Sequence, residues 1–135
     1  MTITLSEANR AISAALAKAE DLGIWVSVTV CDPYGHLIAH QRMEGVFAEA
    51  SRASIGKAIA AAESGQASDA PFKAAASSLT DVVTGGGAPD IRVRGGLPIV
   101  RNGKLEGAVG VSGAPGTEQD EECALAALAA VRKGT

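Results

Sequence analysis

Residues 95–113 read GGLPIVRNGKLEGAVGVSG, and this stretch decides the fold. Two short apolar runs flank Asn102-Gly103, a dipeptide that strongly favours a two-residue hairpin turn because both turn positions need a positive φ. The second run contains Gly107 and Gly110, which carry no side chain. Glycine inside a strand indicates that a helix, another subunit or a ligand approaches the backbone closely. The stretch therefore predicts a β-hairpin with something packed directly on its second strand.

A second hairpin is predicted earlier in the chain. Residues 24–31 are rich in β-branched residues, which favours a strand. The turn sequence Asp32-Pro33-Tyr34-Gly35 follows, with proline at the second turn position. Residues 36–43 then form the returning strand.

Capping signals and helical periodicity predict helices around the two hairpins. Thr4 and Glu7 form a capping-box pattern before the first helix, and Gly23 is its expected stop. The later expected segments are a helix at 49–64 ended by Gly65, a short helix starting at 68–71, a loop at 80–90, an edge strand at 91–94 and a last helix opening at Thr117. The order α-β-β-α-α-β-β-α is typical of an α+β domain on an antiparallel sheet, and we expect one domain over residues 1–135.

The two faces of the predicted sheet differ in chemistry. Strand alternation places the valines at 26, 28 and 30 on one aliphatic face. The opposite face mixes apolar, small and polar side chains, namely Trp25, Ser27, Thr29, Cys31, His36, Ile38, His40, Arg42, Glu106, Ala108, Gly110 and Ser112. A face that carries a tryptophan and an isoleucine is seldom simply solvated. We therefore expect this mixed face to be open to a second subunit or a ligand.

Composition excludes several classes of function. The chain has 135 residues, a net charge of −3 and no cluster of Lys and Arg, which argues against nucleic-acid and membrane-surface partners. No apolar run approaches the roughly 18 residues that span a bilayer, and no secretory signal pattern is seen. The separated Cys31 and Cys123 are expected to be reduced thiols, which favours a cytoplasmic location.

Two cations are candidates for binding an anionic ligand. Arg42 ends a predicted strand beside Glu44, and a planar guanidinium suits a carboxylate. Lys57 interrupts an Ala- and Ile-rich helix, where it would meet a ligand anion or, if desolvated, act as a base or nucleophile. The alternatives are that Arg42 pairs with a nearby acid and that Lys57 either lies on an exposed helix face or holds a buried acid. Because only a short loop separates the strand from the helix, we expect the two cations to converge.

Glycine-rich corners and histidines complete the candidate site. The backbone at Gly95-Gly96 and at Ser112-Gly113 is expected to bind ligand, since free N–H groups before a helix suit an anion. His40 is a candidate general base or lone axial haem ligand, and Glu44 is a candidate to move a proton. His36 and His40 would lie about 13 Å apart along a strand, too far to share one ion, so no metal site is predicted. The acidic run at 120–122 is interpreted as a helix cap and solvated face.

Four stretches together resemble a known family. They are residues 28–37, residues 42–45, residues 51–62 with Lys57-Ala58, and residues 95–98 through 107–113 with 119–121. Their sequence and order resemble the GlcG/HbpS family of small haem-binding-like domains, also found as the C-terminal half of PduO-type proteins. The resemblance implies a profilin-like α+β fold, homo-oligomers and, in some members, haem. The axial ligands associated with the family match no position here and aromatic residues are 3% of the chain, so we expect haem binding to be weak or absent.

Three functional hypotheses remain open from the sequence. In the first, the protein binds haem or another small anionic ligand in a pocket near a subunit interface. In the second, it is a cofactor-independent isomerase, hydratase or lyase acting on a small carboxylic acid. Arg42 would then anchor the carboxylate, and Lys57, Glu44 or His40 would move a proton. In the third, it is a purely structural oligomer.

Overall fold

A four-stranded antiparallel sheet forms the centre of the protein in a computed structural model that describes residues 2–69 and 93–132. The strands are β1 (Ser27–Cys31), β2 (Leu37–Arg42), β3 (Gly96–Arg101) and β4 (Lys104–Ser112). Their order across the sheet is β2-β1-β4-β3. Each predicted hairpin therefore supplies one edge strand and one central strand, and the hairpins join through β1 and β4.

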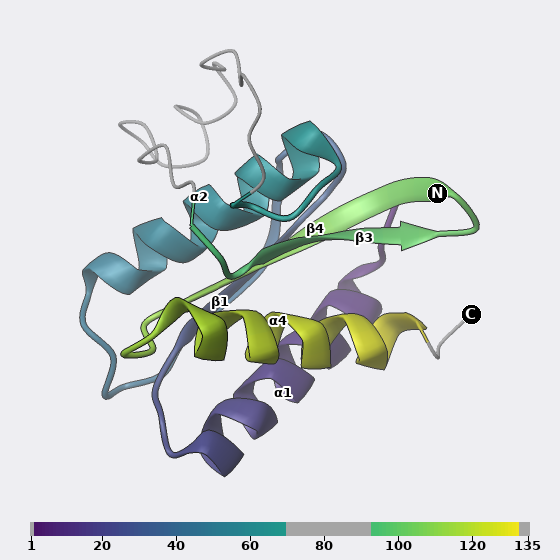
Figure 1. The fold of residues 1–135 in the computed structure, drawn as a ribbon. Coiled ribbons are helices and arrows are strands. Elements are labelled where there is room, and N and C mark those ends of the chain that lie inside the picture. The colour runs from purple at the N-terminus through teal and green to yellow at the C-terminus, as the bar shows by residue number, and fades with distance from the viewer. Residues whose placement is uncertain (1, 70–92, 133–135) are drawn as a thin grey trace.

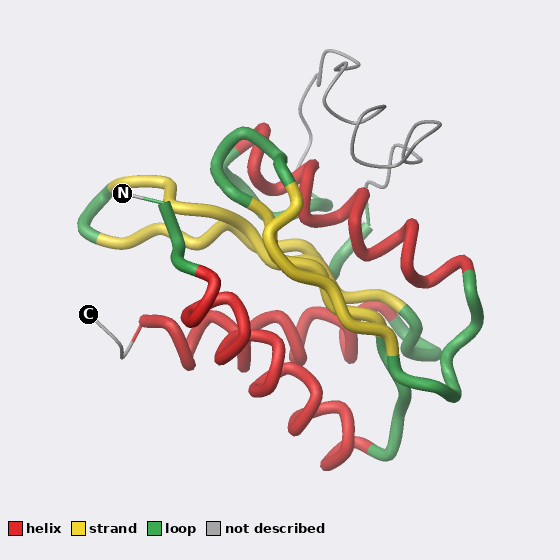
Figure 2. The backbone as a smooth tube through the Cα atoms, turned by 180° about the vertical axis from the view of Figure 1, so that it is seen from behind, coloured by secondary structure: helices red, strands yellow, loops and turns green. Residues whose placement is uncertain are grey.

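Helices cover both faces of this sheet. Helices α1 (Leu5–Leu22) and α4 (Thr117–Arg132) pack side by side on one face, and α2 (Glu49–Ser64) lies on the other (Figure 1, Figure 2). The order of the described elements confirms the predicted α+β antiparallel fold. The short helix expected from residues 68–71 and the loop at 80–90 fall mostly or wholly outside the described residues. Val93 and Arg94 form a bend rather than the expected edge strand.

Local signals placed most element ends correctly. The Thr4 hydroxyl accepts a hydrogen bond from the Glu7 amide at 3.1 Å, while the Glu7 carboxylate accepts one from the Thr4 amide at 2.9 Å, which confirms the capping box. Asn102 and Gly103 have φ values of 53° and 74°, as the predicted hairpin turn requires. Strand β1 begins at Ser27 rather than Ile24, because the Ile24 amide still donates to the Ala19 carbonyl of α1. No helix in the two described segments is long and apolar enough to cross a membrane.

The aliphatic face of the sheet packs against α1 and α4. The residues that fill this layer are Ala8, Ala11, Ile12, Ala15, Ala19, Val26, Val28, Val30, Leu97, Ile99, Val109, Val111, Cys123, Ala124, Ala127 and Val131. Strand alternation predicts Val26, Val28 and Val30 on this face, and their place in one cluster with residues of α1 and α4 confirms it. Alanines on both helices allow α1 and α4 to approach each other and the sheet closely.

The opposite face is not open, so the sequence-based expectation for it is wrong. Helix α2 lies on it and approaches the β4 backbone at Gly110, where a Cβ atom would clash with the Ser54 carbonyl and the Ala58 amide. At Gly96 of β3 a Cβ atom would clash with the Lys57 carbonyl. The segment that the strand glycines predict to lie close to the sheet backbone is therefore a helix of the same chain.

We predict that Gly110→Ala destabilises the fold by about 2 to 3 kcal/mol, because the added methyl group meets helix backbone that cannot rotate away. The matched control is Gly116→Ala, where the added group meets only the end of the flexible Glu118 side chain. Urea unfolding of both variants measures the difference. Equal, small losses would show that α2 does not rest on the β4 backbone.

Candidate functional site

Asp32 organises the turn between β1 and β2. Its Oδ1 atom accepts hydrogen bonds from the amides of Tyr34 at 2.8 Å and His36 at 2.9 Å. Its Oδ2 atom lies 3.0 Å from Nδ1 of His36. Gly35 takes a φ of 83°, which lets the chain turn back so that all three contacts form. Both carboxylate oxygens thus fix the backbone and the imidazole of His36 together.

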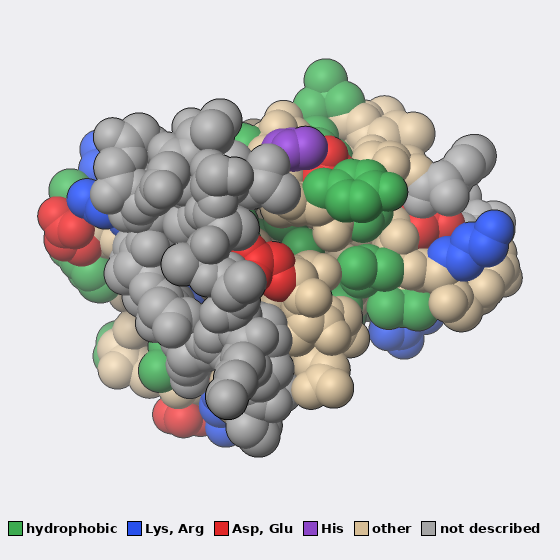
Figure 3. Space-filling model, turned by 90° about the horizontal axis from the view of Figure 1, so that it is seen from above, with side chains coloured by type: hydrophobic (Ala, Val, Ile, Leu, Met, Phe, Trp, Pro, Cys, Tyr) green, Lys and Arg blue, Asp and Glu red, His purple; other side chains and the backbone are tan. Residues whose placement is uncertain are grey.

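The contact fixes which nitrogen of His36 carries a proton. A carboxylate only accepts hydrogen bonds, so Nδ1 is the donor and the neutral ring keeps its lone pair on Nε2. Within residues 2–69 and 93–132, Nε2 has no hydrogen-bond partner. The His36 side chain is 52% exposed, and the ring of Tyr34 lies 6.4 Å away between centroids. Viewed over α2, a surface histidine adjoins an acidic side chain and hydrophobic side chains (Figure 3).

His40 lies in a different environment, between β2, β1 and α2. Its Nδ1 atom is 2.7 Å from the Thr29 hydroxyl, and its Nε2 atom is 3.3 Å from the hydroxyls of Ser27 and Ser51. The Thr29 hydroxyl in turn lies 2.9 Å from that of Ser54 on α2. Burial, with a further contribution from Arg42, lowers the pKa of His40 and favours a neutral ring. Three hydroxyls contact the ring nitrogens and the Ser54 hydroxyl contacts that of Thr29, so this cluster joins helix to sheet.

Lys57 is buried and its charge is paired. Nζ donates to Asp120 Oδ2 at 3.1 Å and to the Val111 carbonyl at 2.8 Å, and both charged residues are only 2% exposed. Asp120 Oδ1 accepts a further hydrogen bond from the Ala114 amide at 3.0 Å. Burial lowers the pKa of Lys57 and raises that of Asp120, and the attraction between the two charges opposes both shifts. The pair links α2 to the end of β4 and the start of α4.

Some of the predicted ligand-binding residues do meet. At Gly95, a Cβ atom would lie 2.8 Å from Lys57 Nζ, and Gly96 packs on the Lys57 backbone. Ser112 is buried and follows Val111, whose carbonyl accepts a hydrogen bond from Lys57 Nζ. Gly113 lies apart from them, against Trp25 and Val46. Gly95 and Gly96 therefore give the buried lysine and its helix room to pack, and their part in ligand binding stays a prediction.

The expected convergence of Arg42 and Lys57 is absent. Arg42 ends the edge strand β2 and is exposed, and β1 lies between β2 and β4. Lys57 reaches past β4 toward Gly95, on the side away from β2. Glu44 is exposed in the turn after β2. The anion site predicted from a convergence of Arg42 and Lys57 is therefore not formed. The enzyme hypothesis, in which Arg42 anchors a carboxylate and Lys57, Glu44 or His40 moves a proton, stays a prediction.

Trp25 and Ile38 also lie elsewhere than alternation suggested. The Trp25 side chain is 57% exposed and covers Gly45, where an added Cβ would clash with the indole ring. Ile38 packs against the aliphatic core beside α1 and α4. The pairing of β1 with β2 shifts register between Val30 and Cys31, whose partners are Ala39 and Leu37. Such an irregularity changes the side of the sheet to which neighbouring side chains of β2 point, and simple alternation does not predict it.

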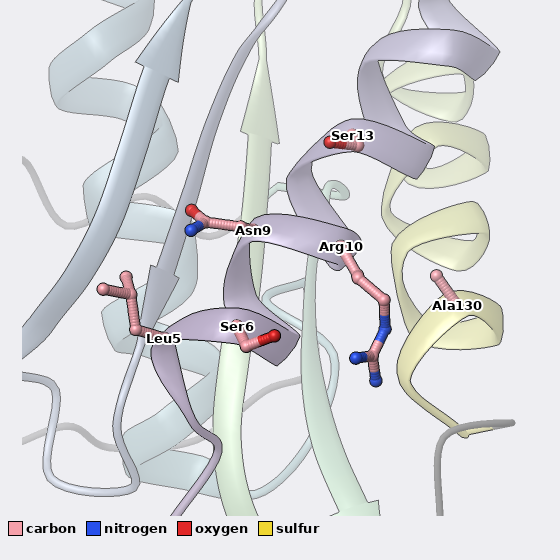
Figure 4. A pocket seen from close by; sticks show the side chains of 6 residues that line it. All are labelled: Leu5, Ser6, Asn9, Arg10, Ser13 and Ala130. Carbon is pink, nitrogen blue, oxygen red and sulfur yellow. The ribbon is translucent and has the colours of Figure 1, made fainter.

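Two of the hollows that the described residues line lie away from the predicted site. One of about 670 Å³ is a shallow groove beside α1, where Arg10 extends toward Ala130 of α4 (Figure 4). Leu5, Ser6, Asn9 and Ser13 complete its lining. The other, of about 110 Å³, lies between β3 and the end of α4. The second hollow is lined in part by Arg101, whose side chain is 10% exposed and whose guanidinium pairs with Glu7 and Glu106.

Metal and thiol chemistry find little support in the described residues. They hold no group of three or more His, Cys, Asp or Glu side chains placed to bind one ion. Cys31 and Cys123 are free and buried, and burial raises the thiol pKa of Cys31 to about 12 and that of Cys123 to about 11. A protonated, buried thiol is a poor nucleophile and a poor ligand.

Sequence reasoning missed the parts played by two acids. Asp120 was interpreted as part of a solvated helix face, but it is buried and pairs with Lys57. An apolar helix interrupted by one lysine is a signal that a buried acid must exist elsewhere, although it does not say where. Asp32 was interpreted only as a turn residue. The spacing Asp-Pro-Tyr-Gly-His, with acid and imidazole at the two ends of a tight turn, was the available signal for their contact.

Comparison with known proteins places this geometry in context. A protein-family model described as haem degrading protein HbpS-like matches residues 3–129. A protein of Citrobacter freundii, described as an uncharacterized 15.0 kDa protein in the dhaT-dhaS intergenic region, is 35% identical over 137 residues, covering 94% of this chain and 90% of the relative.

Two solved structures share the fold over nearly their whole length. The crystal structure of protein ORFY from Klebsiella pneumoniae has a TM-score of 0.80 at 30% identity and covers 97% of this chain and 91% of the other. The crystal structure of the PduO C-terminal domain in complex with haem has a TM-score of 0.77 at 26% identity and covers 96% of this chain and 95% of the other.

We predict that Lys57→Met lowers the free energy of unfolding by about 3 to 5 kcal/mol, because it leaves the Asp120 carboxylate buried without its partner. The double variant Lys57→Met/Asp120→Asn removes that charge while keeping an oxygen for the Ala114 amide, and should recover at least half of the loss. Lys104→Met, at an exposed lysine, is the control. Urea unfolding that shows no more loss for Lys57→Met than for Lys104→Met would contradict the buried pair.

Proposed function

The chain belongs to the HbpS-like family, and from this membership we propose that it is a haem-binding protein. The observation that carries the proposal is the likeness, over 96% of this chain, to a domain whose crystal structure contains haem. When bound, haem supplies an iron centre that exchanges electrons and takes up small ligands.

The side chains of the described residues fit haem, because its iron needs only one ligand from the protein. Haem iron is held by His, Cys, Met or Tyr in known proteins. The two cysteines are buried with raised pKa values, and the Met43 sulfur faces the Val26 amide at 3.2 Å. Both histidines lie on or beside β2, an edge strand, where a planar ligand has access from solvent. The donor set is therefore suited to haem and unsuited to a bare metal ion.

We further propose that copies of the chain associate beside this edge. The outer side of β2 has no strand partner among the described residues. Trp25 and Phe47 expose 57% and 58% of their surface close to the turn that leaves β2. Exposed strand edges and exposed aromatic side chains favour association. A second copy there would place the ligand near a subunit interface. The cytoplasmic location of the protein stays a prediction.

Haem titration tests the proposed function. We expect the haem absorption band to shift and saturate at one haem per chain, with the modest affinity of a solvent-accessible site. Iron-free protoporphyrin is the control because it has the same ring and carboxylates but no iron, and it should bind at least about tenfold more weakly. A band that follows free haem without saturating would refute the proposal. A thermal shift given by small carboxylic acids alone would then favour the enzyme hypothesis.

Light scattering tests the association. We expect the wild type to have the mass of more than one chain at micromolar concentration, and Phe47→Ser to shift it toward one chain. Leu125→Ser is the matched control, because Leu125 is similarly exposed, at 51%, but lies on α4. A wild type with the mass of one chain, or an equal effect of both substitutions, would overturn an interface beside β2.

A further inference from the structure

The two histidines differ in whether a ring nitrogen is available. Both nitrogens of His40 contact hydroxyl groups, at 2.7 Å for Nδ1 and 3.3 Å for Nε2. A ligand atom approaching His40 would have to displace hydroxyls that join β1 to α2. In His36, Asp32 takes up Nδ1 and leaves Nε2 without a partner among the described residues. His36 is therefore the histidine that accepts a ligand without loss of an existing contact.

Asp32 holds His36 in the arrangement that metal-ligating histidines use. Such residues usually donate their second ring N–H to a carboxylate or a carbonyl, which fixes the tautomer and makes the free nitrogen a better electron donor. Here the same carboxylate also accepts the amides of Tyr34 and His36, so it cannot turn away from the ring. The tautomer with its lone pair on Nε2 is thus built into the turn.

The surroundings select haem over a bare ion. Asp32 already contacts two backbone amides and the His36 ring, and the described residues offer no set of three ligand groups. A free divalent ion needs about three or four protein ligands, whereas iron in a porphyrin already has four nitrogens and needs one. Tyr34, 69% exposed and next to the imidazole, offers an apolar ring face to the porphyrin.

We propose that Nε2 of His36 is the axial ligand of haem iron and that Asp32 is its positioning residue. The inference rests on the proposed function and adds to it the residue that binds. Coordination would use the lone pair that the neutral ring carries on Nε2 while Nδ1 donates to Asp32. The negative charge of Asp32 increases electron donation through the imidazole, which favours ferric over ferrous iron.

Haem titration of four variants tests the assignment. His36→Ala should weaken binding at least about a hundredfold, whereas His40→Ala and Tyr34→Phe should bind within about threefold of wild type. Asp32→Asn should weaken binding about 10- to 100-fold and raise the reduction potential of the bound haem. The Asn amide keeps an oxygen for the turn but presents N–H to Nδ1, which moves the ring proton to Nε2.

Chemical rescue separates ligation from damage to the fold. Added imidazole should restore the wild-type haem spectrum to His36→Gly, and circular dichroism should show an unchanged fold in each variant. Saturable binding by wild type with equal affinity in His36→Ala would overturn the assignment and leave the proposed function standing. Loss of binding in His40→Ala or Tyr34→Phe with retention in His36→Ala would likewise overturn it. Failure of the wild type to bind haem would overturn both.

Discussion

The close approach of α2 to the backbone of β4 is the constraint on which the rest of the structure depends. It exists because Gly110 and Gly96 offer no side chain where the helix crosses the sheet. With the helix so near, a long side chain on its inner face has no route to solvent. Lys57 lies there, and its ammonium group has to find acceptors inside the protein. The Val111 carbonyl and Asp120 supply them.

The same packing separates polar groups that hold the fold from polar groups that remain available. Beneath α2, Ser27, Thr29 and Ser54 satisfy one another and His40, and Asp120 neutralises Lys57. An internal hydrogen-bond network of this kind stabilises one arrangement of helix and sheet. Its donors and acceptors are already paired with one another, so few are left to bind a substrate. Polar atoms that remain available to a ligand lie at the periphery, on the edge strand β2 and in the turn before it.

If the proposed function holds, this division would let a small domain bind a large planar cofactor without a deep cavity. A porphyrin brings its own metal ligands, so the protein has to provide one oriented donor and an apolar surface. A turn held by Asp32 provides an oriented donor at little cost to the core, because the carboxylate that caps the turn also fixes the imidazole. An association of copies beside β2 would add the cover that a lone chain lacks.

The sequence by itself determined the positions and types of the described helices and strands. The capping box at Thr4, the stop at Gly23 and the Asn102-Gly103 turn are local signals, because each depends on φ angles or hydrogen bonds within a few residues. The aliphatic face of β1 also followed from alternation. Where alternation failed, at Ile38, the pairing irregularity after Val30 was the cause.

Only the tertiary structure decided what the polar residues do. Lys57 and Asp120 stand 63 residues apart, and no local pattern pairs them. The side of the sheet that α2 covers decided that the mixed face is interior and that Arg42 and Lys57 never meet. The reason is physical: a strand or helix forms from its own backbone, but the charge state and accessibility of a side chain depend on which distant segment excludes water from it.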